Sequence, residues 1–174
     1  MLVMILYNAF IGYITKERVY LYYVLFLIYV ALIIPYQIGD LSIHHIGFND
    51  IAPVIGLFGY LLPTLFAFKY LDMKQKAYRF YVVIGILTIL LVSVSLLYGI
   101  ELFTYAHYLT GITWLSLFYN PILWAVGVYL WVKGNKNARF YTIAWTSTLG
   151  VSLLFFMIRL GIFPYGEYTN YVGY

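Results

Sequence analysis

Residues 80–98 read FYVVIGILTILLVSVSLLY, and no charged side chain interrupts them. A helix of 19 residues rises about 28 Å, close to the roughly 30 Å hydrocarbon core of a bilayer. Arg79 stands directly before the stretch, and Glu101 follows shortly after it. The stretch therefore predicts a helix that crosses a membrane.

The rest of the chain has the same apolar character. Of its 174 residues, 64% are hydrophobic and only 9% are charged, too few polar groups to cover a soluble domain. Many of the 21 tyrosines fall near expected helix ends, Tyr108 and Tyr141 among them. A ring with a polar tip suits the membrane interface, so we expect them to form an aromatic belt.

Apolar runs divide the chain into six expected helices. They cover residues 1–15, 19–37, 51–71, 80–98, 105–132 and 140–160. The first would rise only about 22 Å, as if its outer end were missing. Because the connections are short, neighbouring helices must be antiparallel. We therefore expect an all-α polytopic integral membrane bundle of about six helices, forming one transmembrane domain over residues 1–174.

The basic residues orient this bundle. Nine of the ten Lys and Arg residues fall in three clusters at alternate connections, while the connections around residues 40–50 and around Glu101 contain none. The clusters are Lys16 and Arg18; Lys69, Lys74, Lys76 and Arg79; and Lys133, Lys136 and Arg139. Cytoplasmic loops retain positive charge, so these connections should face the cytoplasm and the N-terminus should lie outside. The same bias accounts for the net charge of +4 without a nucleic-acid partner.

Three side chains near outward helix ends are candidates for ligand binding. Glu101 and His107 are six residues apart and could meet across one connection. Arg159 follows Arg139 by 20 residues, about 30 Å along a helix, so an interfacial anchor is the alternative to a ligand-binding role. His44 and His45 fall in an expected outer loop, and no His pair lies deep in two spans. We therefore expect no metal or haem site.

Prolines inside two expected helices mark candidate conformational pivots. Pro63 removes a backbone hydrogen bond in the middle of residues 51–71, and Asn120-Pro121 does so in residues 105–132. The Asn120 amide could simply satisfy a carbonyl that proline leaves free, which is the structural alternative to a moving bend. Hydroxyls of residues 140–160, together with Gly150, are expected to serve helix packing.

Enzyme signatures are not found. The sequence holds no HExxH, no GxSxG, no glycine-rich phosphate loop with lysine, and no membrane-embedded carboxylate pair. We expect no catalytic residue, no metal and no cofactor in this chain.

Several short motifs resemble one known family. Leu6-Tyr7-Asn8, Lys16-Glu17-Arg18 and the closing stretch from Arg159 to Pro164 are similar to the bacterial seven-transmembrane receptors with diverse intracellular signalling modules. So are Tyr20-Leu21-Tyr22-Tyr23 and Ala138-Arg139-Phe140 with Ala144-Trp145. The resemblance implies a multi-pass protein of the bacterial cytoplasmic (inner) membrane. It also implies an extracellular domain before this region, and a seventh helix and an output domain, such as a histidine kinase or diguanylate cyclase, after it. The chain would then be a fragment or a short form.

Taken together, these features predict a transmembrane module that relays an extracytoplasmic stimulus to a cytoplasmic output domain or partner. The resemblance further implies a homodimer, although no GxxxG motif selects a face for it. A small transporter or permease-like subunit is the alternative, with Asn120 and the hydroxyls of residues 140–160 as its polar path.

Overall fold

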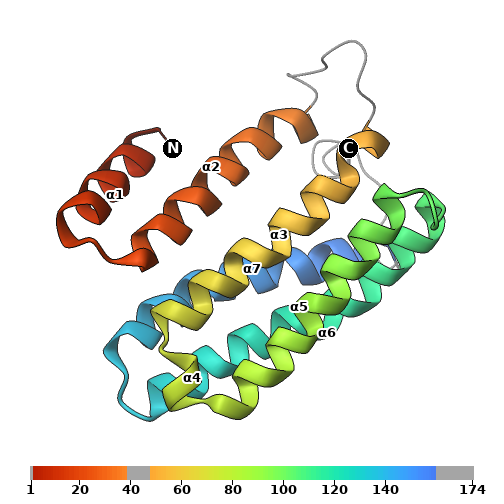
Figure 1. Ribbon diagram of the computed structural model, residues 1–174. Helices are drawn as coiled ribbons and strands as arrows, with labels where there is room; N and C mark the ends of the chain where they lie inside the picture. Colours follow the sequence, from red (N-terminus) through yellow and green to blue (C-terminus); the bar gives the residue numbers. More distant parts are fainter. Residues whose placement is uncertain (1, 39–47, 160–174) are drawn as a thin grey trace.

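The chain folds into α-helices throughout its described parts. The computed structural model describes residues 2–38 and 48–159 (Figure 1). The helices are α1 (Leu2–Thr15), α2 (Arg18–Ile38), α3 (Phe48–Tyr70), α4 (Met73–Lys76), α5 (Tyr78–Gly99), α6 (Tyr105–Val132) and α7 (Lys136–Arg159). The all-α fold is confirmed.

Several boundaries differ from expectation, most of all at α7, which begins at Lys136, four residues before the expected start at residue 140. The single-turn helix α4 was not anticipated, and it follows Asp72, whose φ of 54° reverses the chain after α3. Helix α3 begins at Phe48, three residues before the expected start at residue 51, and it contains Pro53 as well as Pro63.

Three of the described helices are long and apolar enough to cross a membrane. They are Ile51–Tyr70 within α3 (20 residues), α5 (22 residues) and α6 (28 residues). Shorter apolar helices cover Leu2–Thr15 and Arg18–Leu32. The three long helices are consistent in length with the roughly 20 residues that a bilayer core requires.

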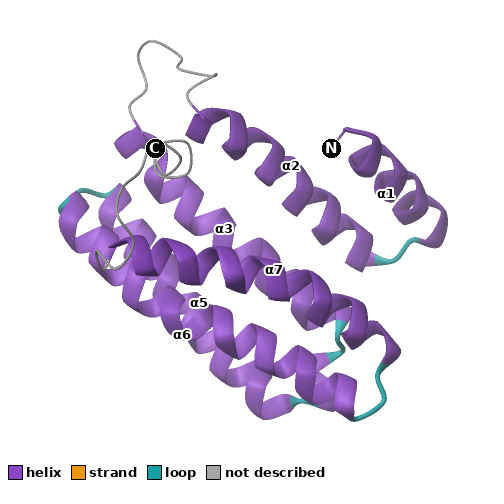
Figure 2. Cartoon of the chain, turned by 180° about the vertical axis from the view of Figure 1, so that it is seen from behind, coloured by secondary structure: helices purple, strands orange, loops and turns teal. Residues whose placement is uncertain are grey.

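Helix α3 lies at the centre of the arrangement. It packs against α2 on one side and α5 on the other, while α6 packs against both α5 and α7. Helix α1 packs on α2 and forms the outer edge in both ribbon views (Figures 1 and 2). The core of buried side chains lies among α3, α5, α6 and α7 and includes Tyr119 and Leu123.

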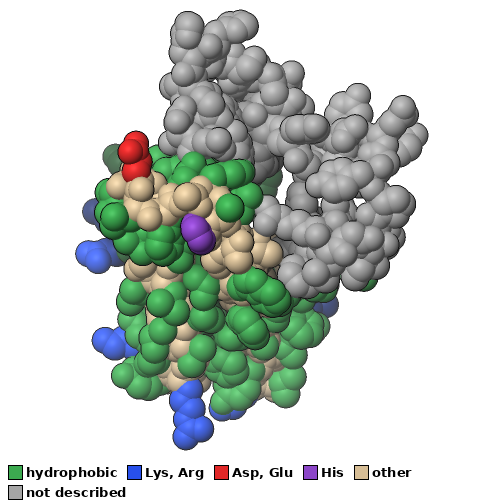
Figure 3. All heavy atoms as spheres, turned by 90° about the vertical axis from the view of Figure 1, so that its right-hand side faces the viewer, with side chains coloured by type: hydrophobic (Ala, Val, Ile, Leu, Met, Phe, Trp, Pro, Cys, Tyr) green, Lys and Arg blue, Asp and Glu red, His purple; other side chains and the backbone are tan. Residues whose placement is uncertain are grey.

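The outer surface is apolar. Large hydrophobic side chains such as Ile89 and Trp114 are more than half exposed. Figure 3 shows hydrophobic side chains over most of the described part of one face, with Lys and Arg side chains projecting at its edges. Soluble proteins rarely expose apolar patches of this extent, so the bundle is embedded in a membrane.

Candidate functional site

The turn between α5 and α6 carries two of the sequence-predicted ligand residues. His107 Nδ1 lies 2.7 Å from the hydroxyl of Thr104, the N-cap of α6. Glu101 is exposed and has a positive φ of 61°. Among the described residues the one ion pair joins Lys76 and Asp72, at 3.7 Å, so Glu101 and His107 do not form one. Arg159 ends α7, but its side chain lies outside the described part, as do His44 and His45.

The three predicted pivot residues lie inside continuous helices. Pro63 is buried in α3, and Asn120 and Pro121 are half-buried in α6. Proline lacks the N–H that would bond the carbonyl four residues back, so α3 is weakened at Pro63 without being interrupted.

A cluster of hydroxyls lies beside Pro63 and joins three helices. Thr64 Oγ1 of α3 is 2.8 Å from Thr88 Oγ1 of α5 and 2.7 Å from Tyr119 Oη of α6. Thr64 and Tyr119 also donate to the carbonyl of Tyr60, at 2.8 and 3.2 Å, and Thr88 donates to the carbonyl of Ile84, at 2.8 Å. We call Thr64, Thr88 and Tyr119 the hydroxyl network.

Three tyrosines from neighbouring helices donate to carbonyls of α3. Tyr29 of α2 donates to Ile55 O at 2.9 Å, Tyr108 of α6 donates to Ala52 O at 2.7 Å, and Tyr119 donates to Tyr60 O. Their hydroxyls therefore tie α3 to α2 and α6 at successive turns. Sequence reasoning missed all three roles: it placed Tyr108 in the aromatic belt, whereas Tyr108 is buried and only 5% exposed.

Two glycines allow these close approaches. A Cβ at Gly59 would stand 2.7 Å from Tyr29 Oη, and one at Gly56 would collide with Ser95 Oγ and stand 2.7 Å from Tyr108 Oη. Gly150 was expected to allow close packing, but no atom of the described residues lies within 4 Å of a Cβ built there. Gly127 takes that role instead, since its Cβ would stand 2.6 Å from Thr142 Oγ1 of α7.

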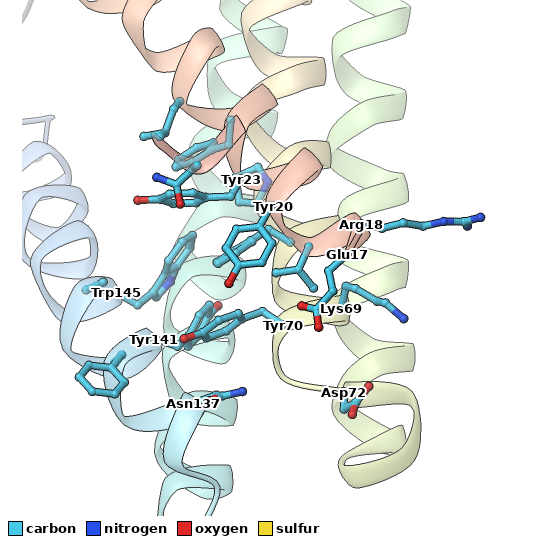
Figure 4. A pocket seen from close by; sticks show the side chains of 18 of the residues that line it. Glu17, Arg18, Tyr20, Tyr23, Lys69, Tyr70, Asp72, Asn137, Tyr141 and Trp145 are labelled. Carbon is cyan, nitrogen blue, oxygen red and sulfur yellow. The ribbon is translucent and has the colours of Figure 1, made fainter. Parts of the chain in front are cut away.

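A cleft of about 1030 Å³ opens between α2, α3 and α7 at the end of the bundle where the basic turns gather. Its walls carry aromatic rings. Tyr23, Phe66 and Tyr70 form one series, with centroids 5.4 and 5.0 Å apart, and Tyr141 stacks on Trp145 at 5.5 Å in the other. Figure 4 shows Tyr20, Tyr23, Tyr70, Tyr141 and Trp145 converging on this space from the three helices.

Two donors in the α7 wall of the cleft have no partner among the described residues. They are Tyr141 Oη and Trp145 Nε1, and both atoms are buried. Tyr141 is 4% exposed and Trp145 is 9% exposed, so neither reaches bulk solvent freely. Tyr141 was expected in the aromatic belt, but it faces the interior of the bundle. An unmade hydrogen bond is costly when buried, so an acceptor oxygen that reached either donor through a shift of the cleft wall would be bound favourably.

The described residues bring no three His, Asp or Glu side chains close enough together to hold a metal ion. The acidic residues of the cleft, Glu17 and Asp72, are exposed. The arrangement therefore offers hydrogen-bond rearrangement in its core and binding in its cleft.

The family model described as 7TM diverse intracellular signalling matches residues 1–174. No curated protein and no solved structure matches the chain.

Proposed function

Because the chain belongs to the 7TM diverse intracellular signalling family, we propose that its bundle relays a stimulus from the outer face of the membrane to an output on the cytoplasmic face. The family gives the protein a membrane-embedded role as a signalling sensor and receptor. The observation that carries the proposal is that the match extends over the whole chain. The family domain is not itself catalytic, so the output belongs to an intracellular signalling module.

The hydroxyl network supports a relay because it can order its protons in more than one way. The three hydroxyl protons of the network are shared among five short contacts. Thr64 Oγ1 makes three of them, with Tyr60 O, Thr88 Oγ1 and Tyr119 Oη. The other two join Tyr119 to Tyr60 O and Thr88 to Ile84 O. Each hydroxyl donates one proton, so at most three contacts are full hydrogen bonds at once. Alternative arrangements of similar free energy are what a two-state element needs.

Helix α3 is the element that such a rearrangement would move. It contacts α2, α5 and α6, so a shift of α3 reaches most of the bundle. Pro63 precedes Thr64 and weakens the helix at the level of the network. Pro121, next to Asn120, weakens α6 two residues after Tyr119. We propose Pro63, Asn120 and Pro121 as the pivots of the relay.

The input and output ends follow from the charge pattern. In this proposal Glu101, His107 and Arg159 lie at the outer face and contact the stimulus or the domain that binds it. The turns that carry Lys16, Lys74 and Lys136 face the cytoplasm, which puts the N-terminus outside. A multi-pass protein of the inner membrane, acting as a homodimer with a cytoplasmic output domain, fits this arrangement.

Distance measurements between spin labels test the pivot at Pro63. The chain contains no cysteine, so Lys74→Cys and Asn137→Cys place one label on α4 and one on α7, both at exposed positions. In lipid nanodiscs we expect two distance populations. Pro63→Ala restores a backbone donor and should shift the ratio of the populations at least fivefold. Gly150→Ala, which meets no atom within 4 Å among the described residues, is the control and should leave the ratio unchanged. A single population, identical in Pro63→Ala, would remove the pivot from the proposal.

A further inference from the structure

The cleft between α2, α3 and α7 combines a charged mouth, unpaired donors and an apolar wall. Its volume, about 1030 Å³, is at the upper end of the roughly 300–1,000 Å³ of small-molecule pockets. We propose that this cleft binds an anionic phospholipid, with the phosphate at the mouth and an acyl chain along the apolar wall. The proposal concerns binding alone and does not depend on the relay.

Charge at the mouth favours an anion. The cations lining the cleft are Lys16, Arg18 and Lys69, and the acids are Glu17 and Asp72. Asp72 is already paired with Lys76 at 3.7 Å, a residue outside the lining. Figure 4 shows Arg18 and Lys69 extending away from the aromatic centre, so they would meet a phosphate at the mouth and leave the interior uncharged.

The interior holds two donors that the oxygens of a lipid would reach through a small shift of the cleft wall, because neither donor atom has accessible surface in this structure. Tyr141 Oη and Trp145 Nε1 are buried and have no partner among the described residues. The ester oxygens of a phospholipid lie one glycerol unit below its phosphate and accept hydrogen bonds. Tyrosine and tryptophan are common at this depth because one end of each ring is apolar and the other polar.

The deeper wall distinguishes a lipid from a soluble phosphate compound. Phe26, Leu27 and Phe66 line the part of the cleft that continues toward the middle of the bundle. A phosphate or a sugar phosphate would leave this apolar wall uncovered, whereas an acyl chain covers it. The bundle is embedded in a membrane, where phospholipid is the abundant amphiphile.

Quenching of Trp145 fluorescence by brominated lipids tests the proposal. Replacing Trp114, Trp124 and Trp131 by Phe leaves Trp145 as the one tryptophan of the full chain. The protein is placed in phosphatidylcholine vesicles with increasing fractions of brominated phosphatidylglycerol or brominated phosphatidylcholine. One cation near an anionic lipid contributes about 1 kcal/mol, equivalent to about fivefold in binding. We therefore expect half-maximal quenching at a phosphatidylglycerol fraction at least fivefold below the phosphatidylcholine fraction.

Two variants test which side chains contact the lipid. Lys69→Gln should reduce the preference for phosphatidylglycerol about fivefold, and Tyr141→Phe should weaken quenching by both lipids about equally. The matched control keeps Trp114 as the one tryptophan. Trp114 is 56% exposed, so its quenching should follow the bulk lipid composition without a headgroup preference.

The outcomes separate lipid from the other sources of phosphate. Equal quenching of Trp145 by both lipids would overturn the proposal, and so would displacement of the brominated lipid by millimolar glycerol phosphate. Native mass spectrometry of the unsubstituted chain gives a readout that needs no tryptophan variants. It should retain one phosphatidylglycerol that Tyr141→Phe loses, and an unsubstituted chain that retains none would equally reject the site.

Discussion

Removing hydroxyls from the network should lower the free energy of unfolding, and the losses from two removed hydroxyls should not be additive. Tyr119→Phe keeps the ring and deletes an Oη that lies 2.7 Å from Thr64 Oγ1 and 3.2 Å from Tyr60 O. One proton makes one full hydrogen bond, and such bonds between membrane helices contribute about 0.6 kcal/mol on average and about 1.7 at most. We expect a loss of about 1 kcal/mol. Thr88→Val deletes the 2.8 Å contact with Thr64 Oγ1 and should cost about 0.6 kcal/mol.

The double variant distinguishes a shared network from separate bonds. Tyr119 and Thr88 act on the same oxygen, Thr64 Oγ1, so their effects should differ from additivity by about 0.5–1 kcal/mol. The assay is unfolding by sodium dodecyl sulfate in mixed micelles, followed by circular dichroism. Tyr29→Phe with Tyr119→Phe is the matched control, because Tyr29 donates to a different carbonyl, Ile55 O, and additivity within about 0.3 kcal/mol is expected. If the losses were additive in both double variants, the idea of a shared network would be refuted.

The remaining predictions concern packing, capping and orientation. Gly127→Ala should destabilise the bundle by about 1–3 kcal/mol in the same assay, because its Cβ would stand 2.6 Å from an atom of α7, while Gly150→Ala stays within about 0.5 kcal/mol. Thr104→Ala removes the N-cap of α6 and should cost about 1 kcal/mol; an unchanged unfolding midpoint would contradict the capping role. On intact cells an impermeant thiol reagent should label Glu101→Cys but not Lys74→Cys, and the reverse pattern would invert the proposed topology.

The helical fold was predictable because apolar composition leaves few alternatives. Within a bilayer every backbone group must be bonded internally, which leaves helices and closed barrels, and the 19 residues 80–98 lack the alternation and the short length of a barrel strand. The turn at Asp72 was not predictable in the same way. Aspartate adopts a positive φ more often than most residues other than glycine, but nothing in Leu71-Asp72-Met73 distinguishes a turn from a helix that continues.

The site was less predictable than the fold because tyrosine has two uses in a membrane protein. Tyr108 and Tyr119 look alike in the sequence, and their burial depends on which face of α6 meets α3. Gly56 and Gly59 held the missing information, since two small residues three apart mark one face of α3. A search for GxxxG spacing does not find them. Because they lack side chains, the hydroxyls of Tyr29 and Tyr108 can reach backbone carbonyls of α3.

Adjacent residues of α3 link the cleft to the network. Pro63 lines the cleft, while the hydroxyl of the next residue, Thr64, lies at the centre of the network. A ligand changes a conformational equilibrium only by the difference in its affinity for the two states. If a lipid in the cleft displaces α3 by a few tenths of an ångström, the 3.2 Å bond from Tyr119 to Tyr60 O weakens first, because it is the longest of the five contacts. Phosphatidylglycerol should therefore change the stability cost of Tyr119→Phe but leave that of Tyr29→Phe unaltered. Equal costs for Tyr119→Phe in vesicles with and without this lipid would separate the cleft from the network.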